Sequence, residues 1–158
     1  MLLDESAFAQ IIASTPLVSI DLVVRNDDGE ILLGKRNNRP AKGYWFVPGG
    51  RIRKNERICD ALERIANSEL GVDVLNSKLL GVFDHFYEDN VFAIPGFGTQ
   101  YVVLGYQLDI FGAVSFVRDS QHAELKWWTI DALLVSDEVH PNTKLYFSEG
   151  PGANNAVS

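Results

Sequence analysis

The sequence contains little of what stabilises secreted proteins or anchors proteins in membranes. Cys59 is the one cysteine among 158 residues, which excludes an intramolecular disulfide and a zinc site built from cysteines. No apolar run approaches the ~20 residues that a membrane-spanning helix needs. The first residues, MLLDESAF, carry acids where a signal peptide would carry bases. These absences predict a soluble protein of the cytoplasm without a membrane partner.

Basic residues are also scarce, and they are unevenly distributed. The chain has 14 Lys+Arg against 21 Asp+Glu, a net charge of −7, which disfavours a nucleic-acid partner because the protein's field repels phosphate. Residues 25–64 nevertheless hold ten bases and six acids (+4), which leaves four bases and fifteen acids (−11) elsewhere. A cationic segment in an acidic protein predicts a small anionic ligand.

The length and the apolar content of 46% fit one domain of ordinary size. The sequence contains no repeat and no low-complexity linker. Residues 150–158 are small and polar, so we expect one domain over residues 1–149 and a flexible tail after it.

The hydrophobic periodicity predicts one central helix among several strands, which favours an α+β sandwich with a mixed sheet over a doubly wound sheet. A turn at residues 26–29 predicts that the strands on either side of it form a hairpin. A loop over residues 88–100 is long enough to indicate a functional lid. The predicted helices span residues 4–14, 56–70 (closed by Gly71) and 130–135, and the predicted strands span residues 17–25, 30–35, 79–87, 101–110 and 126–129.

The most informative segment is residues 49–72, GGRIRKNERICDALERIANSELGV. Its spacing resembles the Nudix box, in which a glycine is followed by a glutamate, an arginine, a glutamate and a glycine at fixed intervals. The resemblance implies an α/β/α sandwich of the Nudix type with the box helix at its centre. The matching positions are Gly50, Glu56, Arg64, Glu69 and Gly71.

The departures from the box indicate altered chemistry. The usual box places three glutamates on one helical face, where they form a cage for divalent metal. Here Ile65 and Ser68 replace two of them, and Glu69 is the one that remains. This predicts one weakly held Mg²⁺ per site, completed by waters, substrate phosphates and neutral oxygens, with Mn²⁺ as a substitute.

Such a loss is typical of one branch of the superfamily, the GDP-mannose mannosyl hydrolases, which the chain resembles from about residue 8 to residue 147. The resemblance implies a homodimer that hydrolyses GDP-mannose, with GDP-glucose as a second substrate, by water attack at the anomeric carbon with inversion. The diphosphate is then the leaving group, which metal and arginines need only neutralise. The similar segments are STPLVSIDLVV (14–24), ILLGKRNNRPAKGYWFVPGGR (31–51), HFYEDN (85–90), YVVLGY (101–106), SQH (120–122) and DALLVSDEVHPNTKLYF (131–147).

The same resemblance implies the roles of individual residues. His122 would be the general base, since an imidazole titrates near neutral pH. The Gly49 carbonyl, Glu69 and Gln121 would hold Mg²⁺. The substrate contacts would be Arg36 and Arg51 on phosphate oxygens, Tyr101 on the departing phosphate, Asp21 in the nucleotide site, His85 on the sugar, and Phe8.

Other interpretations of these residues stay open. Tyr101 and His85 lie in predicted strands, where a core tyrosine and a buried sheet histidine are alternatives. Glu56 and Arg64 are expected to form an ion pair that braces the loop and helix, and Arg64 has a ligand contact as an alternative.

Two other functions also stay open. One is a conventional Nudix pyrophosphohydrolase that splits the diphosphate, and the other is a non-catalytic nucleotide-sugar sensor. No short motif specifies the nucleobase.

Overall fold

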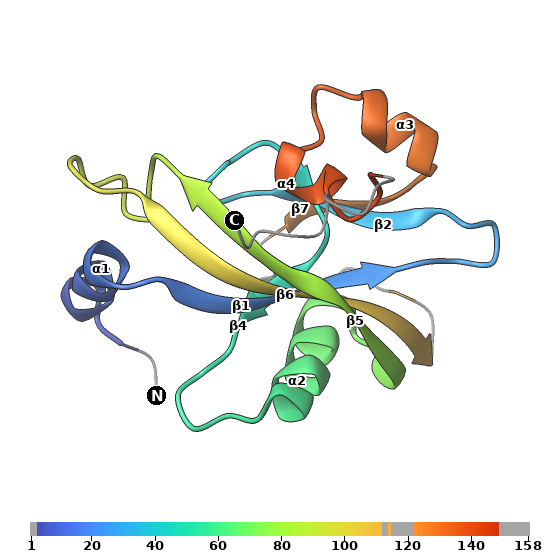
Figure 1. The fold of residues 1–158 in the computed structure, drawn as a ribbon, viewed down its shortest axis with the longest axis horizontal. Helices are drawn as coiled ribbons and strands as arrows, with labels where there is room; N and C mark the ends of the chain where they lie inside the picture. The colour runs from blue at the N-terminus through green and yellow to red at the C-terminus, as the bar shows by residue number, and fades with distance from the viewer. Residues whose placement is uncertain (1–2, 112–113, 115–121, 149–158) are drawn as a thin grey trace.

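The computed structural model describes residues 3–111, 114 and 122–148, and at Phe111, His122 and Ala123 it describes the backbone alone. Helices and strands alternate irregularly along this part of the chain (Figure 1). Their bounds are α1 (Glu5–Ser14), β1 (Leu17–Val24), β2 (Ile31–Arg36), β3 (Trp45–Phe46), β4 (Gly49–Arg51), α2 (Ile58–Leu70), β5 (Asp73–Tyr87), β6 (Thr99–Phe111), β7 (His122–Trp128), α3 (Ile130–Val135) and α4 (Pro141–Lys144).

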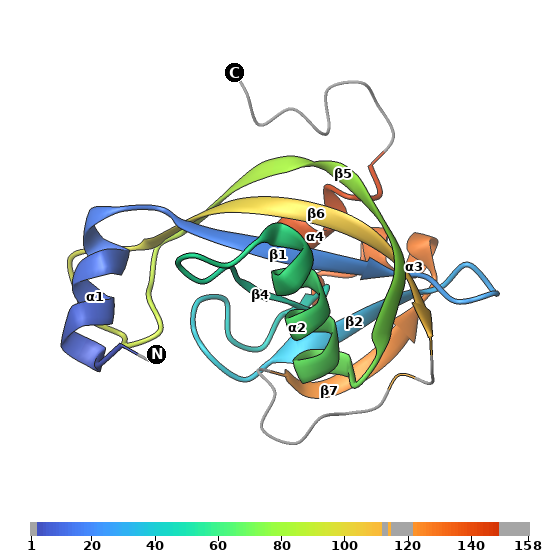
Figure 2. The same ribbon diagram turned by 90° about the horizontal axis from the view of Figure 1, so that it is seen from below.

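The described strands form two sheets. One has the order β4-β1-β6-β5, with β1 parallel to β6 and the other pairs antiparallel, and the other has the antiparallel order β3-β2-β7. Helix α2 lies on one side of the crossing strands, and α3 and α4 lie on the other (Figures 1 and 2). The expected α+β sandwich with a mixed sheet is therefore confirmed. No helix in the described ranges is long and apolar enough to cross a membrane.

The side chains of β1 alternate between two hydrophobic clusters, one on each side of the strand. Ile20, Leu22 and Val24 pack into the cluster that includes α2, whereas Val23 packs into the cluster that includes α3. Because successive side chains of a strand point to opposite faces, Asp21 lies on the same face as Val23, away from α2. Strand β1 therefore presents two polar residues, Ser19 and Asp21, on the face that lines the candidate site.

The predicted hairpin between the first two strands is wrong. The turn forms, because the Asn26 side chain accepts from the backbone N–H groups of Asp28 and Glu30. Beyond an isolated bridge between Arg25 and Ile31, however, β1 and β2 belong to different sheets. Both strands are largely buried, and each pairs instead with a strand from much later in the sequence, β6 or β7. The local turn reverses the chain but does not decide strand pairing.

The box helix closely follows its prediction. Helix α2 ends at Leu70, and Gly71 caps it at φ +64°, the left-handed conformation that favours glycine. Its first residue is Ile58 rather than Glu56, because the Glu56 carboxylate accepts from the Arg53 backbone N–H and so belongs to the preceding loop.

Other boundaries differ from the expectations at strand ends. Helix α3 has the predicted bounds, but β5 begins at Asp73, six residues earlier than predicted, and β7 begins at His122. Helix α4 was not predicted, although Pro141 occupies its first turn and the His140 ring accepts from the Asn142 backbone N–H as its cap. The expected tail over residues 150–158 lies outside the described residues.

Candidate active site

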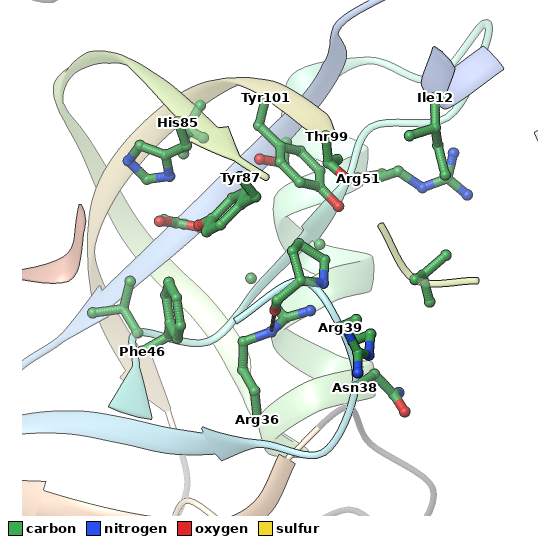
Figure 3. A pocket seen from close by; sticks show the side chains of 18 of the residues that line it. Ile12, Arg36, Asn38, Arg39, Phe46, Arg51, His85, Tyr87, Thr99 and Tyr101 are labelled. Atoms are coloured by element: carbon green, nitrogen blue, oxygen red, sulfur yellow. Dashed lines mark hydrogen bonds between the residues drawn. The ribbon is translucent and has the colours of Figure 1, made fainter. Parts of the chain in front are cut away.

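A cavity of about 250 Å³ lies where the ends of several elements meet. Helix α1, strands β1, β4, β5 and β6 and the loop after β2 all contribute side chains to it. Arg36 extends toward Tyr87 and Tyr101 from the opposite side of the cavity (Figure 3). The lining residues are Phe8, Ile12, Ser19, Asp21, Arg36, Asn38, Arg39, Pro40, Phe46, Val47, Gly49, Gly50, Arg51, His85, Tyr87, Val91, Thr99, Tyr101 and Val103.

Most of the residues that the sequence analysis selected meet in this cavity. Phe8, Asp21, Arg36, Gly49, Arg51, His85 and Tyr101 all line it, although they come from segments up to 93 positions apart in the numbering. The sequence resemblance selected them without reference to their spatial proximity. Their shared location is consistent with one binding site.

Asp21 is tied to the opposite end of the chain. The Tyr146 hydroxyl donates to its Oδ2 atom at 2.7 Å. Burial raises the pKa of Asp21 to about 7, and the Tyr146 hydrogen bond and the nearby Arg36 charge oppose that rise.

Gly49 allows β4 to approach β1 at this point. A Cβ atom on Gly49 would lie 2.5 Å from the Ile20 carbonyl and 2.7 Å from Asp21 Oδ1. Any other residue here would push β4 away from Asp21 and reshape the cavity wall.

The two arginines that were expected to bind phosphate are held by aromatic rings. The Arg51 Cζ atom lies 4.1 Å from the Phe8 ring centroid, and the Arg36 Cζ atom lies 5.6 Å from the Phe46 centroid. Arg36 Nε also donates to the Pro40 carbonyl at 2.9 Å. Within the described residues, neither guanidinium has a carboxylate at ion-pair distance. Their positive charge is therefore available to an anion in the cavity.

His85 presents an unsatisfied ring atom. Its side chain is 3% exposed, and its Nε2 atom has no hydrogen-bond partner among the described residues. Burial, followed by the charge on His140, lowers the pKa of His85 to about 4, so the ring is neutral at pH 7. Because a buried ring nitrogen without a partner is costly, this atom is a candidate contact for a ligand hydroxyl.

Tyr101 lies among charged groups at the same cavity. Burial raises its pKa, while the charges of Arg36 and Arg51 act in the opposite direction. The hydroxyl therefore stays protonated at neutral pH and is able to donate a hydrogen bond to an acceptor such as a phosphate oxygen.

The predicted Glu56–Arg64 ion pair is present. Arg64 Nε donates to Glu56 Oε1 at 2.6 Å and Nη2 donates to Oε2 at 2.9 Å. These bonds lower the pKa of Glu56 to about 2. Arg64 Nη2 also donates to the Arg51 carbonyl at 2.8 Å, so the pair links the loop, α2 and β4.

The described residues around α2 contain no cluster of carboxylates of the kind that holds several cations. Across the described ranges, no three His, Cys, Asp or Glu side chains lie close enough to hold a metal together. Glu69 stands one helical turn beyond Ile65, and Ile65 packs against Gly50 of β4. The Glu69 carboxylate and the Gly49 carbonyl are hard oxygen donors of the kind that Mg²⁺ prefers.

The remaining predicted residues fall at the border of the described chain. Gln121 lies outside the described residues. The backbone of His122 pairs with Arg36 in the β2–β7 ladder, so β7 begins beside one of the two cavity arginines.

Several residues that line the cavity or support it were not predicted from the sequence. Asn38 and Arg39 follow Arg36 closely in the sequence, and this proximity was the one signal that pointed to them. Tyr87 and Phe46 gave no such signal, and Tyr146 reaches Asp21 across 125 positions.

Comparisons with known proteins agree with this architecture. A family model described as the NUDIX domain matches residues 15–148. The "Low-salt glycan biosynthesis protein Agl8" of Haloferax volcanii is 44% identical over 117 residues, which cover 73% of this chain and 72% of that protein.

Two solved structures show the same fold. The structure of a MutT NUDIX hydrolase from Burkholderia pseudomallei has a TM-score of 0.70 and 28% identity, and the match covers 84% of this chain and 96% of that one. The NUDIX domain of Shewanella oneidensis NrtR, complexed with ADP ribose, has a TM-score of 0.65 at 19% identity, with coverage of 92% and 96%. The fold that residues 49–72 predicted is therefore confirmed.

Proposed function

The chain belongs to the Nudix domain family, and from this premise we propose that it hydrolyses a nucleoside-diphosphate sugar, GDP-mannose, at the anomeric carbon. The observation that carries the proposal is a local imbalance of charge. Arg36 and Arg51 face the cavity without a described carboxylate partner, while the box has kept one of its three usual glutamates.

The arginines suit a diphosphate that departs as GDP. A planar guanidinium donates two parallel hydrogen bonds to phosphate oxygens, and its charge offsets the negative charge that develops on the leaving group. Tyr101 adds a neutral donor across the cavity from Arg36. These groups would stabilise the departing phosphate without activating water against phosphorus.

The altered box argues against attack on phosphorus. Ile65, which replaces one box glutamate, is 1% exposed and packs in the core against Gly50. The side chain at position 65 is thus part of the hydrophobic core, and a glutamate there would require different core packing. Nudix hydrolases generally use divalent metal ions, and here Gly49, Glu69 and Gln121 would hold one Mg²⁺, which neutralises diphosphate charge when bound.

The water that attacks carbon needs a base, and we assign that role to His122 from the family resemblance. An imidazole with an ordinary pKa is an efficient base near pH 7. His85 would contact the sugar through its buried Nε2 atom, and Asp21 would contact the nucleotide. The name of the Haloferax volcanii relative, a glycan biosynthesis protein, is compatible with a nucleotide-sugar substrate.

The decisive experiment is hydrolysis of GDP-mannose in ¹⁸O-water with Mg²⁺, followed by mass analysis of the products. We expect label in free mannose, unlabelled GDP, and a first-formed sugar of inverted anomeric configuration by NMR. Label in a phosphate-bearing product overturns the proposal in favour of a pyrophosphohydrolase. Tight binding without turnover overturns it in favour of a sensor.

GDP-glucose, assayed in parallel, tests the second substrate. The homodimer that the resemblance implies stays a prediction, and light scattering coupled to size-exclusion chromatography measures it directly.

A further inference from the structure

Phe8 of α1 makes two aromatic contacts that join separate parts of the cavity wall. Its ring face lies under the Arg51 guanidinium, at 4.1 Å from the centroid to Cζ. The ring also meets Phe92 edge to face, with centroids 5.8 Å apart and an interplanar angle of 87°. Figures 1 and 2 both show α1 beside the loop that joins β5 to β6, which carries Phe92.

The contact with Phe8 constrains Arg51 in a particular way. A ring beneath the guanidinium covers one planar face and leaves the N–H groups around the edge available to acceptors. Within the described residues, no hydrogen bond from the Arg51 guanidinium accompanies this stacking. The stacking is therefore the described contact that limits the rotation of a long, flexible side chain.

The loop that carries Phe92 is itself well braced. Asn90 is fully buried and accepts from the backbone N–H groups of Phe92 and Ile94, at 3.2 and 3.1 Å. Its amide donates to the carbonyls of Ile94 and Phe97, at 2.8 and 3.0 Å. Phe92 thus extends from a loop whose backbone is fixed next to it, and it supports Phe8 from the side.

We propose that Phe8 and Phe92 are positioning residues that orient the Arg51 guanidinium toward the anionic part of the ligand. The proposal rests on the proposed function, because it takes that anionic part to be a diphosphate. Phe8 then acts through Arg51 rather than by stacking on the nucleobase. The packing of α1 on the loop thereby sets how strongly the cavity binds diphosphate.

Inorganic pyrophosphate is the discriminating probe, because it has the diphosphate but no base or sugar. Titration calorimetry with pyrophosphate and with GDP, each with and without Mg²⁺, compares wild type with Phe8→Leu, which removes the ring and keeps an apolar side chain. A lost cation–π contact predicts binding of both probes weaker by about 3- to 30-fold. Phe8→Tyr keeps the ring face and should restore wild-type affinity.

A double-mutant cycle tests whether Phe8 acts through Arg51. In an Arg51→Ala background, Phe8→Leu should cause no further loss of pyrophosphate affinity, since the group that it positions is gone. Phe92→Leu should weaken pyrophosphate binding in the same direction as Phe8→Leu but less. Phe86→Leu, at a phenylalanine 67% exposed on β5, is the matched control and should bind as wild type does.

Several results would overturn the inference. If Phe8→Leu weakens GDP binding and leaves pyrophosphate binding unchanged, the ring contacts the base directly. If its effect persists in full without Arg51, Phe8 acts by another route. If wild type binds GDP and pyrophosphate but Phe8→Leu changes neither, this inference fails while the proposed function stands. If wild type binds neither, the proposed function fails with it.

Discussion

Arg51 and Arg64 belong to the same strand–loop–helix segment, yet they are held by opposite kinds of partner. Arg64 is engaged by two Glu56 oxygens at 2.6 and 2.9 Å, whereas Arg51 lies over the Phe8 ring. A carboxylate fixes an arginine and cancels its charge, but an aromatic ring fixes it and leaves the charge in place. The type of partner therefore indicates whether an arginine stabilises the fold or is available to bind an anion.

The same contrast explains where the positive charge of residues 25–64 is located. Arg64 raises the local base count, but its ion pair removes most of its field. Arg36 resembles Arg51, because it is held by the Phe46 ring and a backbone carbonyl. The positive electrostatic field that an anion would meet is thus concentrated at the cavity, and it is not spread evenly along residues 25–64.

The largest predicted effect is the loss of activity in Arg51→Ala. If this guanidinium stabilises the departing diphosphate, removing it should lower kcat/KM for GDP-mannose by about 10²- to 10³-fold, as for other donors to developing negative charge. The free energy of unfolding should change by no more than about 0.5 kcal/mol, because the side chain is exposed and has no carboxylate partner among the described residues.

Steady-state kinetics measures the predicted loss of kcat/KM, and urea denaturation measures the free energy of unfolding. Arg57→Ala removes an exposed arginine from the same segment and serves as the matched control. An Arg51→Ala protein with wild-type kcat/KM would show that the aromatic contact does not mark a ligand-binding arginine.

The opposite result is expected for Arg64→Ala. This change leaves the partly buried Glu56 carboxylate without its partner and the Arg51 carbonyl without a donor. We expect a loss of about 1–3 kcal/mol in the free energy of unfolding, with a change in kcat/KM much smaller than that of Arg51→Ala. A large kinetic loss at unchanged stability would favour the alternative that Arg64 contacts the ligand.

The ion pair should also give stability a defined pH dependence. The pKa of Glu56 is about 2 in the folded chain against an ordinary value of 4.5, so the unfolded chain takes up the proton first as pH falls. The contribution of the pair is complete only well above pH 4.5, and it is lost as pH falls through 4.5 toward 2.

Glu56→Gln isolates this contribution. The difference in the free energy of unfolding between wild type and Glu56→Gln, measured in urea at a series of pH values, should be constant above pH 5 and shrink below pH 4.5. A difference that does not vary between pH 3 and pH 7 would mean that the Glu56 charge contributes nothing to stability.

The parts of this structure that sequence predicted are those decided by nearby residues. Helix α2, its Gly71 cap and the Glu56–Arg64 pair follow from spacings of eight residues or fewer along one segment. The prediction of a hairpin between β1 and β2 was wrong, because β1 pairs with β6 and β2 pairs with β7, and both partners come from far along the chain.

The candidate site shows the same limit. The resemblance selected Asp21, Arg36 and Arg51, which do line one cavity, and the roles given to them stay predictions. The supports of these residues were not predicted, since Phe46 and Tyr146 are recognised as supports only once the strands bring them into contact. Sequence thus identified the charged groups and missed the groups that hold them.

The smallest predicted effect concerns a third kind of arginine. Arg39 pairs with Asp89 at 3.3 Å, and both side chains are partly exposed to water, at 51% and 37%. Such a pair contributes about 0–1 kcal/mol, so Arg39→Ala and Asp89→Ala should have nearly wild-type melting temperatures.

The same pair should have a small effect on activity. Because Arg39 lies at the cavity, its loss should lower kcat/KM, and loss of Asp89 should raise it, each by less than about threefold at low salt. Both changes should vanish at about 1 M salt, where exposed charges are screened. A loss in Arg39→Ala as large as that in Arg51→Ala, and unaffected by salt, would place Arg39 on the ligand and would end the distinction between ring-held and carboxylate-held arginines.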